Sequence, residues 1–219
     1  WKFGDKEQYR AFGNFGQFAT KEFSKDANDA YLLDFQGGVE AKFGGEDVAK
    51  KPKFKVTAAG GYYTTVNLAQ RTGNGFYAVG DSPNLGNATQ TFISGGKTNT
   101  LFLADFNVVN ARGEAVWAIS AQPFLGTPCQ LTIGGEYVKN LTSAYQNLSD
   151  DQTEGWTVQV AFGEAKKKGQ WQVAYQYKDI QADATWDALT DSDWGNGGTD
   201  RRGHVVKAAY NVLDWWQLG

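Results

Sequence analysis

One Gly-rich stretch near the C-terminus gathers side chains that could hold a metal ion. Asp191, Asp193, Asn196 and Asp200 lie within it, and carboxylate and amide oxygens are the ligands that Ca²⁺ prefers. Their spacing does not match an EF-hand loop. The alternative is a solvated loop in which Asp and Gly shape turns. We keep Asp191, Asp193 and Asp200 as weak candidates for a metal site, and expect neither a metal nor a cofactor.

Basic residues follow directly, where the chain returns to a regular pattern. Arg201 and Arg202 could face acidic solutes at the mouth of a channel, or could pair with carboxylates of the preceding loop. His204 is the only histidine, so a Ser-His-Asp triad would have to be built around it. The chain also has a single cysteine, Cys129. We expect a protein that is not an enzyme.

The longest regular pattern, from Val108 to Asn140, predicts a hairpin of two long strands. Apolar residues and glycines occupy every second position, and Arg112 and Glu114 lie in the middle of the opposite face. The first arm has about 16 residues, far more than the usual 5 to 6. We expect a turn over Phe124–Pro128, because its Gly and Pro favour a reversal. A strand of this length with one continuous apolar face is typical of a barrel wall in a membrane.

The same two-residue period predicts further strands along the chain. They cover residues 9–19, 31–43, 54–68, 156–162, 171–177 and 206–212. Residues 69–107 are predicted to be irregular, with a short strand at 101–106. Longer and shorter connections alternate without a break. This alternation favours an antiparallel up-and-down barrel with loops on one rim and turns on the other, and a Greek-key sandwich is not expected to keep it.

The composition sets limits on the class of protein. No run approaches the roughly 18 apolar residues of a membrane helix, which excludes a helical membrane protein but not a β-barrel. The net charge of −3 gives no reason to expect nucleic acid as a partner. The chain starts at Trp1 without a Met. We therefore expect residues 1–219 to be a single transmembrane β-barrel domain, incomplete at both ends and part of a barrel of roughly 16 strands.

Strand parity assigns a set of charged residues to the inside of this barrel. They are Asp34, Glu40, Lys42, Lys55, Arg112, Glu114, Glu136, Lys178 and Lys207. Charges that line a wet pore set its ion preference, and five basic against four acidic residues predict weak selectivity. The alternative is inter-strand ion pairing without a role in transport. The segment 69–107 could fold inward to narrow the channel, or could form a surface loop or a subunit contact.

Four segments carry a resemblance to a known family. They are Asp29–Leu32, Gly135–Asn140, Lys166–Tyr177 and Asp191–His204, of which the last is the most specific. Through them the chain resembles the putative porin family of the bacterial outer membrane. The resemblance implies a passive, water-filled channel for small hydrophilic solutes and ions. Outer-membrane lipid is then a partner, and a homotrimer is one assembly open to such a chain.

Two other classes of protein stay open from the sequence. A soluble or surface-attached β-sandwich could bind carbohydrate on its aromatic-rich strands, but it would cover its apolar face with a second sheet. A structural outer-membrane barrel with a plugged lumen would have the same strand pattern as an open channel.

Overall fold

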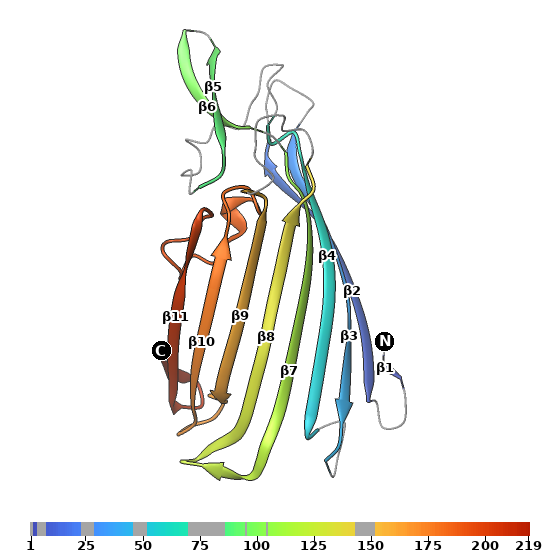
Figure 1. The fold of residues 1–219 in the computed structure, drawn as a ribbon, viewed down its shortest axis with the longest axis vertical. Helices are drawn as coiled ribbons and strands as arrows, with labels where there is room; N and C mark the ends of the chain where they lie inside the picture. The colour runs from blue at the N-terminus through green and yellow to red at the C-terminus, as the bar shows by residue number, and fades with distance from the viewer. Residues whose placement is uncertain are drawn as a thin grey trace.

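The computed structural model describes residues 2–3, 8–22, 29–45, 52–69, 86–94, 96–103, 105–142 and 152–219. Ten strands form one antiparallel sheet, in the order β1-β2-β3-β4-β7-β8-β9-β10-β11-β12 (Figure 1). A separate two-stranded sheet, β5-β6, is inserted between β4 and β7. The strands are β1 (Lys2–Phe3), β2 (Tyr9–Lys21), β3 (Ala30–Phe43), β4 (Phe54–Val66), β5 (Thr89–Ser94), β6 (Lys97–Phe102), β7 (Asn107–Phe124), β8 (Thr127–Asn140), β9 (Glu154–Gly163), β10 (Trp171–Ile180), β11 (Arg201–Leu213) and β12 (Trp216–Leu218).

The sheet confirms the predicted all-β meander, in which each long strand pairs with its neighbours in the chain. β7 has 18 residues, and its alternating side chains follow the pleat of β8 over most of its length. The sheet ends at β1 on one side and β12 on the other, and no pairing joins these two strands in the described part of the chain. The predicted closure into a barrel is therefore not part of the observed fold. Among the described residues, no helix is long and apolar enough to cross a membrane.

The predicted alternation of long and short connections follows the two ends of the sheet, except that the connection after β2, residues 22–29, is shorter than the connection after β3, residues 44–53. Strands β2, β4, β8 and β10 finish at one end of the sheet, which we call the loop end (Figure 1). Strands β3, β7, β9 and β11 finish at the opposite end, the turn end (Figure 1). The separation follows from the meander, because each antiparallel strand returns the chain to the other end.

Two local predictions were wrong. The turn between β7 and β8 is not five residues long, but consists of Leu125 and Gly126. Both have positive φ, as a tight type I′ hairpin turn requires, and Pro128 is already part of β8. The segment 69–107 also holds a hairpin, β5-β6, whose second strand ends at Phe102 rather than at residue 106. Its turn contains Gly96 with positive φ, so the Gly95-Gly96 pair in the sequence was the signal that would have predicted it.

The buried core is small and lies at the loop end. It consists of Ala30, Leu32, Tyr63, Leu68, Phe102, Phe106, Val108 and Trp186. Phe102 and Trp186 meet edge to face at 6.5 Å between ring centroids, joining β6 to the loop between β10 and β11. This core attaches the long connections to the sheet.

Candidate functional site

The two faces of the sheet differ in chemistry. Cross-strand pairing puts Phe43, Phe54, Trp117, Leu131, Phe162, Val173 and Ala208 in one row across seven strands. We call this side the apolar face. Trp156, Val158 and Val160 of β9 are 42%, 47% and 43% exposed on it. Large apolar side chains are therefore left in contact with the surroundings along whole strands.

Aromatic residues on the apolar face form two belts. The belt at the loop end contains Phe15, Phe35, Tyr62, Tyr137, Trp156 and Tyr177, and the belt at the turn end contains Phe43, Phe54, Trp117, Phe162, Trp171 and Tyr210. Neighbouring rings pack together, as in Phe15–Phe35 at 4.9 Å and Trp156–Tyr177 at 5.1 Å between centroids. Apart from Tyr175 of β10, small and aliphatic residues fill the band between the belts. From Tyr62 to Phe54 this band runs about 27 Å along β4, which a strand tilt of about 35–45° reduces to a height of roughly 20 Å, somewhat less than the apolar band of about 25 Å in outer-membrane barrels.

The opposite side, the polar face, carries the charged residues that the sequence assigned to a pore. Cross-strand pairing puts on it Asp34, Glu40, Lys42, Lys55, Arg112, Glu114, Glu136, Lys178, Lys207 and Arg201. Arg202 lies on the apolar face, opposite Asp179, because adjacent residues of a strand point to opposite sides. Arg201 donates a hydrogen bond to the carbonyl oxygen of Gly195 in the preceding loop rather than to a carboxylate.

Several of these charges are paired. Glu40 lies 3.5 Å from Arg10 and 3.8 Å from Lys42, and Lys55 lies 3.8 Å from Glu114. Arg10 was missed in the sequence because the apolar alternation of β2 is interrupted by Phe12 and Phe18. Inter-strand ion pairing therefore applies to some of the charged residues on the polar face. Such pairing is compatible with these residues lying beside a channel.

Three hollows adjoin one another along the polar face, from the loop end towards the turn end. A cavity of about 370 Å³ lies under the loop between β10 and β11. It shares Glu136 and Thr157 with a smaller hollow of about 150 Å³ that also contains Arg112. That hollow shares Glu114 and Gln159 with a third of about 550 Å³. Together they form a continuous polar track across β7 to β10.

The loop 181–200 is fixed on the polar face at the loop end by three side chains from distant parts of the chain. The Tyr63 hydroxyl, on β4, lies 2.7 Å from the Thr185 hydroxyl oxygen and accepts a hydrogen bond from Trp186 N–H. Asn140, at the end of β8, donates to the carbonyl oxygen of Asp183.

Asn87 makes the densest set of these contacts. Its amide nitrogen donates to the carbonyl oxygens of Ala182 and Thr185 at 2.7 and 2.9 Å, and its amide oxygen accepts from Asp187 N–H at 2.8 Å. Asn87 is 3% exposed. No local sequence pattern identifies these anchors, because their partners are far away in the chain.

An ion pair joins the same loop to the strand wall. Lys178 Nζ donates to Asp191 Oδ2 at 2.7 Å and lies 5.3 Å from the centre of the Trp194 ring. Asp191 Oδ1 accepts from Asp193 N–H. The hydrogen bond from Lys178 holds the pKa of Asp191 below its usual value. Asp191 therefore acts as the partner of a lysine.

The metal hypothesis finds no support in this geometry. Within the described ranges, no group of three or more His, Cys, Asp or Glu side chains is arranged to hold a metal ion, and this includes Asp191, Asp193 and Asp200.

The carboxyl group of Asp183 is buried in the same loop. Asp183 is 4% exposed and lies near Asp187 and Asp200. Its Oδ1 accepts from Ala88 N–H, and burial raises the pKa of its carboxyl.

His204 lies on the apolar face, across from Tyr177 of the loop-end belt. Its Nδ1 lies 2.7 Å from the Tyr175 hydroxyl, and its ring is 4.9 Å from that of Tyr177. These neighbours are aromatic, as in the interfacial girdles of membrane proteins.

The molecule is a single-layer antiparallel β-meander with one exposed apolar face and one polar face. A model of the putative porin family matches residues 2–216, and the chain belongs to this family. The predicted family is confirmed by this match. No curated protein and no solved structure matches the chain.

Proposed function

We propose that this chain forms part of the wall of an outer-membrane channel through which small hydrophilic solutes and ions diffuse passively. The observation that carries the proposal is the division of the sheet into two faces. Large apolar residues between two aromatic belts suit lipid, and the charged polar face suits a wet lumen. Family membership supports the same function.

In this channel, the polar track is the path of the solute and no covalent step is involved. Lys55, Arg112, Glu114 and Glu136 lie along the track and would act on passing ions, while Arg202 is left out of the proposed lining because it lies on the apolar face. The loop 181–200 narrows the path at the loop end. Closure of the wall, with roughly 16 strands in all, is part of the proposal.

A structural barrel with a plugged lumen is the second candidate. The observation that favours it is the loop 181–200, which is held on the polar face by buried hydrogen bonds. A sandwich is less compatible with the fold, because the second described sheet is the β5-β6 hairpin and it joins the core at the loop end.

Conductance of the detergent-purified, full-length protein in a planar lipid bilayer tests the proposal. We expect stable ohmic steps with weak ion preference, measured from the reversal potential across a salt gradient. Protein that is β-rich by circular dichroism in detergent but gives no steps would contradict an open channel and support the plugged barrel. Protein that is monodisperse without detergent would contradict the membrane assignment itself.

A further inference from the structure

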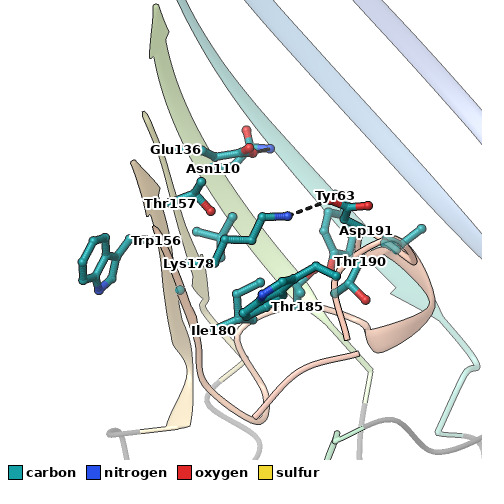
Figure 2. A pocket seen from close by; sticks show the side chains of 14 residues that line it. Tyr63, Asn110, Glu136, Trp156, Thr157, Lys178, Ile180, Thr185, Thr190 and Asp191 are labelled. Carbon is teal, nitrogen blue, oxygen red and sulfur yellow. Dashed lines mark hydrogen bonds and ion pairs between the residues drawn. The ribbon is translucent and has the colours of Figure 1, made fainter. Parts of the chain in front are cut away.

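A cavity of about 370 Å³ separates the loop 181–200 from the strand wall of β7 to β10 (Figure 2). Figure 2 shows Lys178 reaching from its strand to Asp191, the ion pair at which the loop meets this wall. Hydrogen bonds hold the loop at residues 182–187, and their partners are Tyr63, Asn87 and Asn140. The inward position of the loop therefore depends on this short segment and on one ion pair.

The side chain of Asp183 lies inside the segment 182–187 and is 4% exposed. Its Oδ1 accepts a hydrogen bond from Ala88 N–H at 2.9 Å, whereas its Oδ2 is buried without a hydrogen-bond partner among the described residues. An ionised carboxylate with one oxygen buried and unpaired has lost hydration that it keeps in water, which costs free energy. The protonated carboxyl is neutral, so the same burial costs it far less.

Two further carboxylates of the same loop oppose the ionisation of Asp183. They belong to Asp200 and to Asp187, which is 2% exposed. Burial is the larger cause and these two negative charges are the smaller one, and together they raise the pKa of Asp183 above its usual value. The docked loop therefore favours the protonated form of Asp183.

The other elements packed against Asp183 supply no compensating positive charge in the described part of the chain. They contact it through neutral groups: the Ala88 N–H before β5, the Asn140 amide at the end of β8, and the Gln152 carbonyl oxygen before β9. The acidic residue of β9, Glu154, is engaged by Lys139 at 2.8 Å. Ionisation of Asp183 thus adds an uncompensated charge to the segment that holds the loop.

We propose that protonation of Asp183 locks the loop 181–200 onto the polar face, so that the channel is narrow in acid and widens as this carboxyl ionises. The inference rests on the proposed channel, in which the loop narrows the path of the solute. Docking is strongest below the pKa of about 3.9 of a free aspartate, and weakens as the pH rises through the raised pKa of the docked form. The pair of Asp191 with Lys178 has the opposite pH dependence, because the pKa of Asp191 is lowered.

Hydrogen exchange of the loop 181–200, measured by mass spectrometry on the full-length protein in detergent, tests the lock without requiring an open pore. Asp183→Asn keeps the acceptor for Ala88 N–H and is neutral at every pH. At pH 4 the loop should exchange at a similar rate in both proteins. At pH 7 it should exchange at least about threefold faster in the unmodified protein, because each unit of raised pKa corresponds to about a tenfold change in loop opening. Comparison at the same pH removes the intrinsic pH dependence of exchange.

Asp193→Asn is the matched control, because it removes an exposed carboxylate of the same loop. It should exchange as the unmodified protein does at both pH values. The lock is overturned by equal exchange of the unmodified protein and Asp183→Asn at pH 7, or by an equal slowing in Asp183→Asn and Asp193→Asn.

Conductance in a planar bilayer then tests the consequence for the channel. We expect the unmodified protein to conduct less at pH 4 than at pH 7, and Asp183→Asn to keep the lower conductance at pH 7. Conductance that responds to pH equally in both proteins would contradict the narrowing in acid. Failure of the channel itself gives a different result, because pH-dependent exchange without conductance at any pH would keep the lock and contradict the open channel.

Discussion

Lys178 of β10 and Asp191 of the following loop form a 2.7 Å ion pair between Nζ and Oδ2, at the point where the loop meets the polar face. The lysine side chain is 7% exposed and that of the aspartate 38%. A buried ammonium group is stable only with a partner, so the pair holds the loop in its inward position.

Asp191→Asn should destabilise the folded protein by about 1–2 kcal/mol. This is less than the roughly 3–5 kcal/mol for breaking a fully buried pair, because water screens the exposed carboxylate. Urea unfolding in detergent measures the change. Asp193→Asn is the control and should stay within about 0.5 kcal/mol of the unmodified protein. Equal losses in the two variants would show that the ion pair is not the cause.

The same pair predicts a loss of stability in acid. Lys178 lowers the folded-state pKa of Asp191, so the carboxylate contributes stability at pH values above its unfolded-state pKa of about 3.9. This contribution is lost as the pH falls through the lowered pKa. The difference in unfolding free energy between the unmodified protein and Asp191→Asn should therefore be constant above about pH 5 and shrink below about pH 4. A difference that grows in acid would contradict this assignment.

Asp183→Asn should change the stability of the folded protein in the opposite direction from Asp191→Asn. Burial raises the pKa of Asp183, so its contribution to stability is fully present in acid and is lost as the pH rises through the raised pKa. Asparagine keeps the acceptor for Ala88 N–H and removes the charge. We expect the variant to be more stable than the unmodified protein at pH 7 and to lose this advantage towards pH 4, as measured by thermal unfolding in detergent. A variant that is less stable at pH 7 would contradict the prediction.

Asn87→Ala should release the loop 181–200 at a cost of about 2–4 kcal/mol. The substitution leaves the carbonyl oxygen of Thr185 and the N–H group of Asp187 without their partner, whereas the carbonyl oxygen of Ala182 still accepts from the Thr199 hydroxyl. Each unsatisfied buried group costs about 1–3 kcal/mol. Urea unfolding and protease cleavage within the loop measure the effect. Asn14→Ala removes an exposed 3.3 Å hydrogen bond to Gln36 and is the control, expected to have little effect.

Arg112→Gln should shift the channel towards cations, whereas Arg202→Gln should not. The two arginines lie on opposite faces of the sheet, so only Arg112 faces the proposed path. A unit charge about 10 Å from a passing ion in water is worth roughly 0.4 kcal/mol, or about a twofold change in the cation-to-anion permeability ratio. Reversal potentials across a KCl gradient measure this ratio. An equal shift in both variants would contradict the assignment of the faces.

Val158→Arg and Gln159→Arg test which face meets lipid. Val158 lies between the aromatic belts on the apolar face, and Gln159, the next residue, lies on the polar face. An arginine near the middle of a bilayer costs about 2–4 kcal/mol, but in a wet lumen its charge stays solvated. Folding yield into lipid vesicles should fall for Val158→Arg and be retained for Gln159→Arg. Equal yields would argue against insertion of this sheet into a membrane.

Sequence alone predicted most of the meander because its pattern is local. A two-residue period identifies a strand and both of its faces, so β3 was predicted to within a residue at its start, and the alternation of connections predicted the two ends of the sheet. The errors were in turn chemistry. Leu125–Gly126 makes a shorter turn than expected, and β5-β6 was hidden in a segment rich in Gly, Asn and Thr.

The sequence by itself thus determined the strands, the separation of apolar from charged residues, and the family. The tertiary structure decided how the loop 181–200 lies. Tyr63 and Thr185 meet across 122 residues of chain, and no local period relates such positions. It also decided the role of Asp191, whose place in an acidic loop suggested a metal ligand until the fold put Lys178 beside it. The physical reason is that a carboxylate's role depends on which cation lies nearest, and long-range packing determines this.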